Sequence, residues 1–199
     1  MNGGESANLQ ALVFKNRGLL LALPAAALLI FGRPDLFSIT LGLPLAVIGE
    51  LVRCWAVGYS GVTTRNDVVT APQLITAGPY GYVRNPLYLG NFITAAGFAI
   101  AFTGGNASAV RTALIVGCLA CMLAVYVIVV AHEERFLRGQ FGERFEAYCA
   151  RVPRIVPQLR APQDRNGSWR PSVLVDAESK TFAIFAAMIV ALFVRLRIG

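Results

Sequence analysis

A chain of 199 residues in which 56% are hydrophobic and only 15% are charged departs from the composition of a soluble globular domain. The formal net charge of +7 comes mostly from arginines beside apolar segments, where they meet anionic lipid headgroups, and no aromatic RNA-binding signature accompanies it. A nucleic-acid-binding protein is therefore excluded, and a membrane protein is predicted.

Four apolar segments are predicted to span the membrane, in chain order 18–32, 36–60, 87–103 and 109–131. The first is retained rather than cleaved as a signal peptide, because the sequence GRPD that follows it is not a small-residue cleavage site. A shorter apolar run at 182–194 is interpreted as a fifth span, a re-entrant segment or a helix lying against the others. The predicted fold is an all-α, polytopic transmembrane helix bundle of four to five spans.

The basic residues favour one orientation of this bundle. Lys15, Arg17, Arg65, Arg84 and the basic residues from 135 to 180 flank one end of the predicted spans, whereas only Arg33 and Arg111 fall in the opposite loops. Because positively charged loops stay in the cytoplasm, we expect a multi-pass protein of the bacterial inner membrane with a cytoplasmic N-terminus. Arg195 and Arg197 argue against a complete fifth crossing.

The segments between the spans differ in character. Residues 1–16 are polar and are expected to be loose, and residues 161–180 read as a linker in which Trp169 is an interfacial anchor. Between them, residues 132–160 form a charged segment that is ended by prolines 153 and 157. Apolar side chains recur in it at helical spacing, so one face can rest on apolar surface: Phe136, Leu137, Phe141, Phe145 and Tyr148.

The cysteines and the histidine carry no metal or disulfide signal. Cys54, Cys118, Cys121 and Cys149 make no disulfide framework, and the CxxC pair at 118 and 121 lies inside an apolar helix. Small packing residues are the favoured interpretation of that pair. With a single histidine in the chain, no metal site is expected.

The stretch GPYGYVRNPLYLGN at 78–91 places a polar, aromatic turn at the start of the third span. Asn85 is predicted to cap that helix and Pro86 to occupy its first turn, which leaves free N–H groups beside Arg84 for an anionic group. Gly78, Pro79 and Gly81 allow close backbone approach, and tyrosines 80, 82 and 88 offer π faces to a cation. An interfacial aromatic belt with a helix cap is the alternative.

Two further groups of charges lie near the same membrane surface. Glu133 and Glu134, at the end of the fourth span, either are solvated or pair with a ligand ammonium. Glu50 and Arg53 lie three residues apart on one face inside the second span. Because charges at membrane depth usually face the bundle interior, these two either pair with each other or belong to an active site or its access path.

Two sequence blocks resemble one family closely. GPYGYVRNPLYLGN is similar to the pattern GPY-x-x-x-RHP-x-Y-x-G, and HEERFLRGQFGERFEAYCARVPRIVP to EE-x-x-L-x-x-x-FG-x-x-Y-x-x-Y-x-x-x-VP-x-x-P, of the integral-membrane methyltransferases. That family includes isoprenylcysteine carboxyl methyltransferase, with phospholipid N-methyltransferases as cousins. The resemblance covers roughly residues 74–157, and GELVRCWAVG in the second span is a weaker match.

The resemblance implies a methyltransferase domain over residues 1–160, followed by a C-terminal linker and short apolar helix at 161–199, and S-adenosylmethionine as the methyl donor. It implies catalytic roles for Arg53, Glu134 and Arg151, the last by orienting a substrate carboxylate. The cofactor-binding residues that it implies are Gly78, Tyr80, Arg84, Asn85, Pro86, Tyr88, Gly90, Glu133 and Glu134. Asn85 stands where the carboxyl methyltransferases usually have His, which is closer to the phospholipid enzymes and leaves the acceptor open.

Membrane lipids and a lipophilic or small-molecule methyl acceptor are the expected partners. The acceptor atom is a carboxylate, amine or thiol, so a phospholipid N-methyltransferase and a small-thiol S-methyltransferase both remain as alternatives. A non-enzymatic alternative is a membrane scaffold whose tyrosines and arginines bind lipid headgroups. Such a scaffold has no need of both an anion-binding helix start and a carboxylate pair at one surface.

Overall fold

The computed structural model describes residues 3–61, 71–163 and 165–199, and within these it is all-α, with no strand. The segment VTTRNDVV, which contains Arg65, falls outside the described residues. The helices are α1 (Gly3–Lys15), α2 (Arg17–Phe31), α3 (Leu36–Ser60), α4 (Pro86–Thr103), α5 (Ser108–Phe141), α6 (Glu143–Arg151) and α7 (Ser172–Ile198), with a 3₁₀ turn η2 (Gly78–Gly81) before α4.

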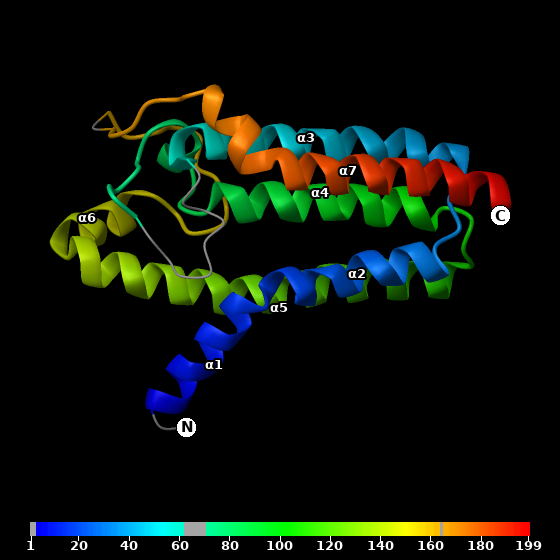
Figure 1. Ribbon diagram of the computed structural model, residues 1–199, viewed down its shortest axis with the longest axis horizontal. Coiled ribbons are helices and arrows are strands. Elements are labelled where there is room, and N and C mark those ends of the chain that lie inside the picture. Colours follow the sequence, from blue (N-terminus) through cyan, green and yellow to red (C-terminus); the bar gives the residue numbers. More distant parts are fainter. Residues whose placement is uncertain (1–2, 62–70, 164) are drawn as a thin grey trace.

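Helices α2, α3, α4, α5 and α7 run along the long axis of the molecule, and α1 leaves the bundle at an angle (Figure 1). Helix α6, η2 and the connecting segments gather at one end, which we call the loop end. The turns between α2 and α3 and between α4 and α5 lie at the opposite end with the C-terminus, which we call the hairpin end. There the Gly105 amide donates to the Arg33 carbonyl at 2.7 Å, so the two turns are joined.

Within the described residues, four helices are long and apolar enough to cross a membrane: α3, α4, α5 and α7. The protein is therefore a multi-pass membrane protein, as predicted, but the set of spans differs from the expected one. The predicted span 18–32 forms α2, whose 15 residues extend only about 22 Å, less than the roughly 30 Å of a hydrocarbon core.

The C-terminal region also departs from expectation. Residues 161–180 were expected to be a linker, but the chain is helical from Ser172, and the apolar run 182–194 is part of the 27-residue α7. Arg195, expected to oppose a crossing, lies at the hairpin end and donates from Nη2 to the Gly32 carbonyl at 2.8 Å. Trp169 lies against Gly58 near the end of α3 and keeps 45% of its surface exposed.

Helices α3 and α4 form the closest pair, because glycines face each other at two levels. A Cβ on Gly42 would lie 2.3 Å from the Gly97 carbonyl oxygen, and a Cβ on Gly49 would lie 2.4 Å from the Thr94 nitrogen. In each helix the glycines are seven residues apart, at 42 and 49 and at 90 and 97. Small residues let helix backbones approach closely in a membrane, where apolar surface alone gives no preference for a protein partner over lipid.

We expect Gly97→Ala to destabilise the bundle, because its Cβ would lie 2.3 Å from the backbone nitrogen of Ala46. Overpacking of this kind lowers the free energy of unfolding by about 1–3 kcal/mol. Gly117→Ala in α5 is the matched control, since no atom lies within 4 Å of its new Cβ. Thermal unfolding in detergent measures both variants. Equal midpoints for the two would contradict the close α3–α4 contact.

Other core contacts correct one expectation and confirm another. Residues 1–16 were expected to be loose, but α1 begins at Gly3, and Phe14 near its end is buried against Met122 and Tyr126 of α5. That burial anchors the polar N-terminal segment to the bundle. Cys118 is buried in the main core, and its Sγ lies 3.6 Å from the Pro24 carbonyl, as the packing interpretation of the CxxC pair predicts.

Candidate active site

A cavity of about 590 Å³ opens at the loop end of the bundle. The junction of α1 and α2, all four spanning helices, helix α6, and the segments 71–75 and 80–86 contribute to its wall. Most of the residues singled out in the sequence line it together: Arg53, Tyr80, Arg84, Asn85, Pro86, Tyr88, Glu133 and Glu134. The two sequence blocks therefore meet on one cavity.

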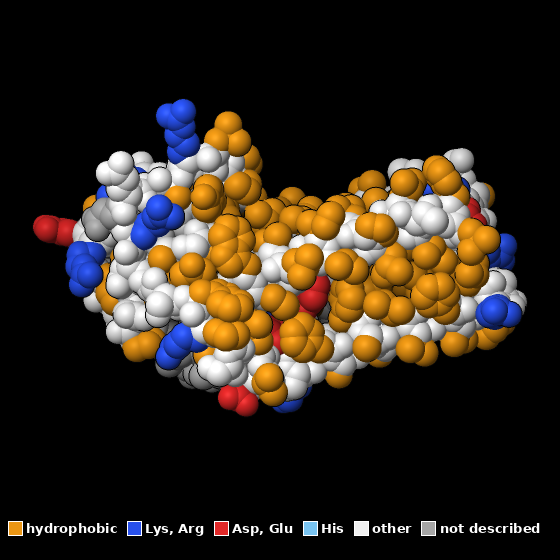
Figure 2. Space-filling model, turned by 90° about the horizontal axis from the view of Figure 1, so that it is seen from above, with side chains coloured by type: hydrophobic (Ala, Val, Ile, Leu, Met, Phe, Trp, Pro, Cys, Tyr) orange, Lys and Arg blue, Asp and Glu red, His pale blue; other side chains and the backbone are white. Residues whose placement is uncertain are grey.

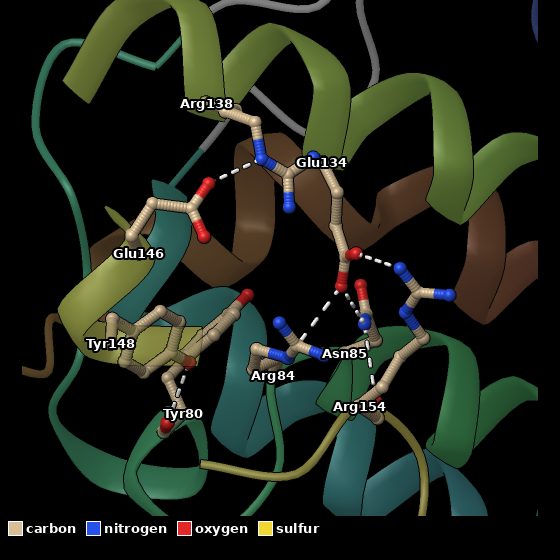
Figure 3. Close-up of polar contacts among 8 residues, drawn as sticks. All are labelled: Tyr80, Arg84, Asn85, Glu134, Arg138, Glu146, Tyr148 and Arg154. Atoms are coloured by element: carbon tan, nitrogen blue, oxygen red, sulfur yellow. Dashed lines mark hydrogen bonds and ion pairs between the residues drawn. The ribbon is translucent and has the colours of Figure 1, made fainter. Parts of the chain in front are cut away.

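Glu134 is the centre of the polar contacts in this cavity (Figure 3). Its side chain is buried, with 4% exposed, and one oxygen pairs with the guanidinium of Arg154. The other oxygen lies 3.6 Å from Nε of Arg84 and accepts a long hydrogen bond of 3.5 Å from Nδ2 of Asn85. One carboxylate thus links α5 to the start of α4 and to the segment after α6.

The predicted cap at Asn85 is wrong in one respect. Asn85 stands at the N-cap position of α4, but its side chain makes no capping hydrogen bond. Its amide instead donates to Glu134 and, at 3.1 Å, to the Arg154 carbonyl. The negative field of Glu134 orients the amide as a donor, so the side chain does not cap the first N–H groups of α4.

The aromatic turn is held by the segment that follows it in the second block. The Tyr148 hydroxyl donates to the Tyr80 carbonyl at 2.7 Å, the Arg84 amide donates to the Pro153 carbonyl at 2.9 Å, and the Gln158 amide donates to the Tyr82 carbonyl at 3.0 Å. Burial raises the pKa of Tyr80 and that of Tyr148 above the ordinary value, so both hydroxyls stay protonated. These hydrogen bonds tie the turn to the second block.

The charged segment 132–160 contains the last turns of α5 and the whole of α6. Helix α5 continues to Phe141, and Gly142, with φ of +49°, breaks it before α6. This break turns α6 back, so that Phe145 and Tyr148 are buried with Leu74. The predicted apolar face therefore packs on the protein's own loop.

The deep side of the cavity is aromatic and polar. The Tyr88 hydroxyl donates to Glu133 at 2.6 Å, and the Tyr88 and Tyr126 ring centroids are 4.8 Å apart. Nη1 of Arg53 donates to Oδ1 of Asn91 at 2.8 Å, one turn further along α4. The cavity thus places π faces and carboxylates between the loop end and the membrane-spanning part of the bundle.

Three of the implied site residues do not line the cavity. Gly78, with φ of +60°, makes room for the ring of Tyr59, and Gly90 packs its backbone against Gly49 and Arg53. The side chain of Arg151 is exposed at the end of α6, and its Nε donates to the Ala147 carbonyl at 3.2 Å. Tyr82, proposed to face a cation, lies instead beside Trp55, with ring centroids 6.1 Å apart.

The sequence reading missed several cavity residues. They come from the α1–α2 junction, from α4 and α5, and from α7: Lys15, Arg17, Asn91, Tyr126, Glu178, Lys180 and Thr181. Asn91 is the last residue of the block NPLYLGN, so its place in the first block could have indicated it. Glu178 and Lys180 were not predicted as site residues, because charges before the apolar run 182–194 are typical of a linker.

Helices of spanning length and a charged cavity at one end define a multi-pass membrane protein with a polar site at one end of its bundle. The model of the phospholipid methyltransferase family matches residues 37–144, more than half of the chain. The chain belongs to this family. The predicted resemblance is confirmed, and methyltransferases of this family use S-adenosylmethionine.

Individual relatives are distant and diverse. The chain is 34% identical over 119 residues to the cobalt-zinc-cadmium resistance protein CzcN of Cupriavidus metallidurans, covering 60% of this chain and 47% of CzcN. Methanethiol S-methyltransferase 1 of Bradyrhizobium diazoefficiens is 33% identical over 93 residues, 46% of this chain and 29% of that enzyme. Protein-S-isoprenylcysteine O-methyltransferase of Schizosaccharomyces pombe is 28% identical over 130 residues, 62% and 52% of the two chains.

The chain spans about half or less of the length of these relatives. No solved structure gives a significant match.

Proposed function

We propose that the protein is an integral-membrane, S-adenosylmethionine-dependent methyltransferase that acts on a lipophilic or small acceptor. The observation that carries this proposal is the meeting of the two family blocks on one cavity, where Arg84, Tyr88 and Glu133 all face the same space. A headgroup-binding scaffold has no use for buried carboxylates beside those cations.

The residues present fit the chemistry of the cofactor. Its carboxylate suits the cations that line the cavity, Lys15, Arg17, Arg84 and Lys180, and its ammonium suits Glu133. A sulfonium suits the π faces of Tyr88 and Tyr126. The cavity of about 590 Å³ also lies in the range of roughly 300–1,000 Å³ that small-molecule sites occupy.

The bound cofactor supplies an electrophilic methyl group on a positively charged sulfur. Held by Arg84, Tyr88 and Glu133, it would supply that methyl group to a lone pair of the acceptor and leave as the neutral thioether. The protein's part is alignment and exclusion of water. Tyr148 and Glu134 fix the walls, while Tyr88, held by Glu133, presents its ring to the cavity.

The depth of the cavity and the names of the relatives bear on the class of acceptor. The cavity reaches membrane depth at Arg53 and Asn91, which supports an acceptor that arrives from the lipid side. The names of two relatives describe methyl transfer to methanethiol and to isoprenylcysteine, so thiol and carboxylate acceptors both accord with the proposal, as does a phospholipid amine. CzcN is named for metal resistance, but the described residues contain no group of three side chains that could hold a metal ion.

We also propose that the loop end faces the cytoplasm of a bacterial cell. Most basic residues lie at that end, and Arg33, Arg111, Arg195 and Arg197 belong to the hairpin end. This distribution follows the rule that positive loops stay inside. The cofactor would then enter from the cytoplasm and the acceptor from the membrane.

The test is binding of S-adenosylhomocysteine, the demethylated product, to the purified protein. At a concentration of about 100 times the dissociation constant, binding adds about 2.7 kcal/mol and raises the unfolding midpoint by roughly 5–10 °C. Adenosine alone, which lacks both charged groups, is the matched control and should give a smaller shift. A midpoint unmoved by millimolar S-adenosylhomocysteine would favour the scaffold.

A further inference from the structure

A group of charges lies at the deep side of the cavity, within the bundle. The Arg53 guanidinium pairs through Nη2 with Glu178 of α7, and the same nitrogen donates to Thr181 at 3.2 Å. Its Nη1 donates to Asn91 of α4 at 2.8 Å, and its Nε lies 3.7 Å from Oε2 of Glu50. One guanidinium thus joins three spanning helices.

Helix α7 is packed on the bundle along its length. Near its start Ala177 and Glu178 are buried, further along Met188 and Leu192 belong to the main core, and Arg195 bonds to Gly32 at the hairpin end. Figure 1 shows α7 running beside α3 and α4. The family match ends at residue 144, so α7 lies wholly outside it.

These charges lie deeper than the cluster around Glu134. Arg53 bonds to Asn91 of α4, whereas Glu134 bonds to Asn85, six residues or about 9 Å of helix nearer the loop end. Figure 2 shows a few acidic side chains among hydrophobic ones midway along the molecule. Charges at such depth are costly to bury and mark functional sites.

The two carboxylates draw Arg53 in different directions. Glu178 and Thr181 line the cavity with Arg53, whereas Glu50 does not line it. The contact with Glu178 therefore turns the guanidinium toward the cavity, and the contact with Glu50 turns it back into α3. The relative strength of the Glu178 and Glu50 contacts therefore decides whether Arg53 faces a bound acceptor.

We propose that α7 completes the acceptor end of the active site, with Glu178 as the residue that positions Arg53. This inference rests on the proposed methyltransferase function and adds to it a specific residue outside the family's matched region. Arg53 is the group that contacts the acceptor, and Glu178 acts through it. The cofactor end, around Arg84 and Glu134, does not depend on Glu178.

The charge balance makes Glu178→Gln an informative variant. Removing the charge of Glu178 leaves Arg53 with the Glu50 carboxylate, whose Oε2 lies 3.7 Å from its Nε. The buried guanidinium therefore keeps a carboxylate partner in the variant, which favours preserved folding. Arg53 is expected to turn toward Glu50 and away from the cavity.

The experiment compares wild type, Glu178→Gln, Glu178→Asp and Asp176→Asn in lipid nanodiscs. Asp176 is exposed on the same helix and is absent from the cavity wall, so Asp176→Asn is the matched control. Affinity for S-adenosylhomocysteine, unfolding midpoint, and kcat/KM for the best acceptor are measured for each. We expect Glu178→Gln to keep affinity and midpoint but to lose about tenfold or more in kcat/KM, with partial recovery in Glu178→Asp.

Two results would overturn the inference while leaving the proposed function intact. Wild-type kcat/KM in Glu178→Gln would mean that α7 takes no part in the reaction. A parallel fall of midpoint, affinity and kcat/KM would mean that Glu178 is structural. Absence of both binding and turnover in the wild-type protein would contradict the proposed function, and the inference with it.

Discussion

Glu134→Gln is expected to lower the affinity for S-adenosylhomocysteine by about 100-fold and to reduce methyl transfer in proportion. The variant keeps the shape of the side chain but removes the charge that holds Arg84 and Arg154. Losing a charge-assisted contact costs about 1.5–3 kcal/mol, which at its upper end is about 100-fold in affinity, and Arg84, at 13% exposed, is the cation that loses its buried carboxylate partner. Calorimetric titration of the purified variant measures the loss directly.

A second glutamate in Figure 3 supplies the control for this experiment. Glu146 pairs with Arg138, but both side chains are about half exposed, so solvent screens the pair and it contributes little to stability. Glu146→Gln should therefore bind S-adenosylhomocysteine like the wild type. Equal affinities in the Glu134 and Glu146 variants would show that the Glu134 contacts do not organise the cofactor site.

Arg84→Ala is expected to weaken S-adenosylhomocysteine binding by ten- to a hundredfold, or about 1.5–3 kcal/mol. Arg84 is 13% exposed at the cavity wall and directly precedes Asn85 at the uncapped start of α4, where a carboxylate would meet free N–H groups. Arg84→Lys keeps the charge without the planar fork and should give an intermediate affinity.

Arg151→Ala is the matched arginine control for binding, since Arg151 lies outside the cavity wall. Its affinity for S-adenosylhomocysteine should equal that of the wild type, and the contrast with Arg84→Ala is the result that matters. Equal losses in both variants would indicate a general effect of surface charge. Methyl transfer by Arg151→Ala is measured separately. Loss of methyl transfer with unchanged affinity for S-adenosylhomocysteine would support the acceptor-orienting role that the family resemblance implies.

The sequence predicted the all-α class. It also predicted those cavity residues that lie within short, strongly patterned stretches of the chain. Tyr88, Arg84 and Glu134 stand in blocks with strong family patterns, and the start of α4 at Pro86 follows from proline's fixed backbone angle. The meeting of the two blocks was expected because both were placed at one membrane surface. Their contacts could not be derived, since the carboxylate of Glu134 gathers partners from three segments.

Long-range contacts explain the misses. Asn85 looked like a cap because residue preferences describe isolated helices, whereas the buried charge of Glu134 claims its amide. Gly78 and Gly90 looked like ligand-contacting glycines but instead admit Tyr59 and the backbone of α3. The start of α7 looked like a linker because Glu178 and Lys180 interrupt its hydropathy, and the burial of Glu178 at the cavity depends on Arg53 from another helix.

The measurement that tests the central claim most directly is transfer of labelled methyl from S-adenosylmethionine by the protein in proteoliposomes. Prenylcysteine analogues, phosphatidylethanolamine and small thiols are the acceptors to compare, with Glu134→Gln as the matched inactive control. The account predicts label in at least one acceptor with the wild-type protein and at least about 100-fold less with Glu134→Gln. No transfer to any acceptor, together with no binding of S-adenosylhomocysteine, would contradict it.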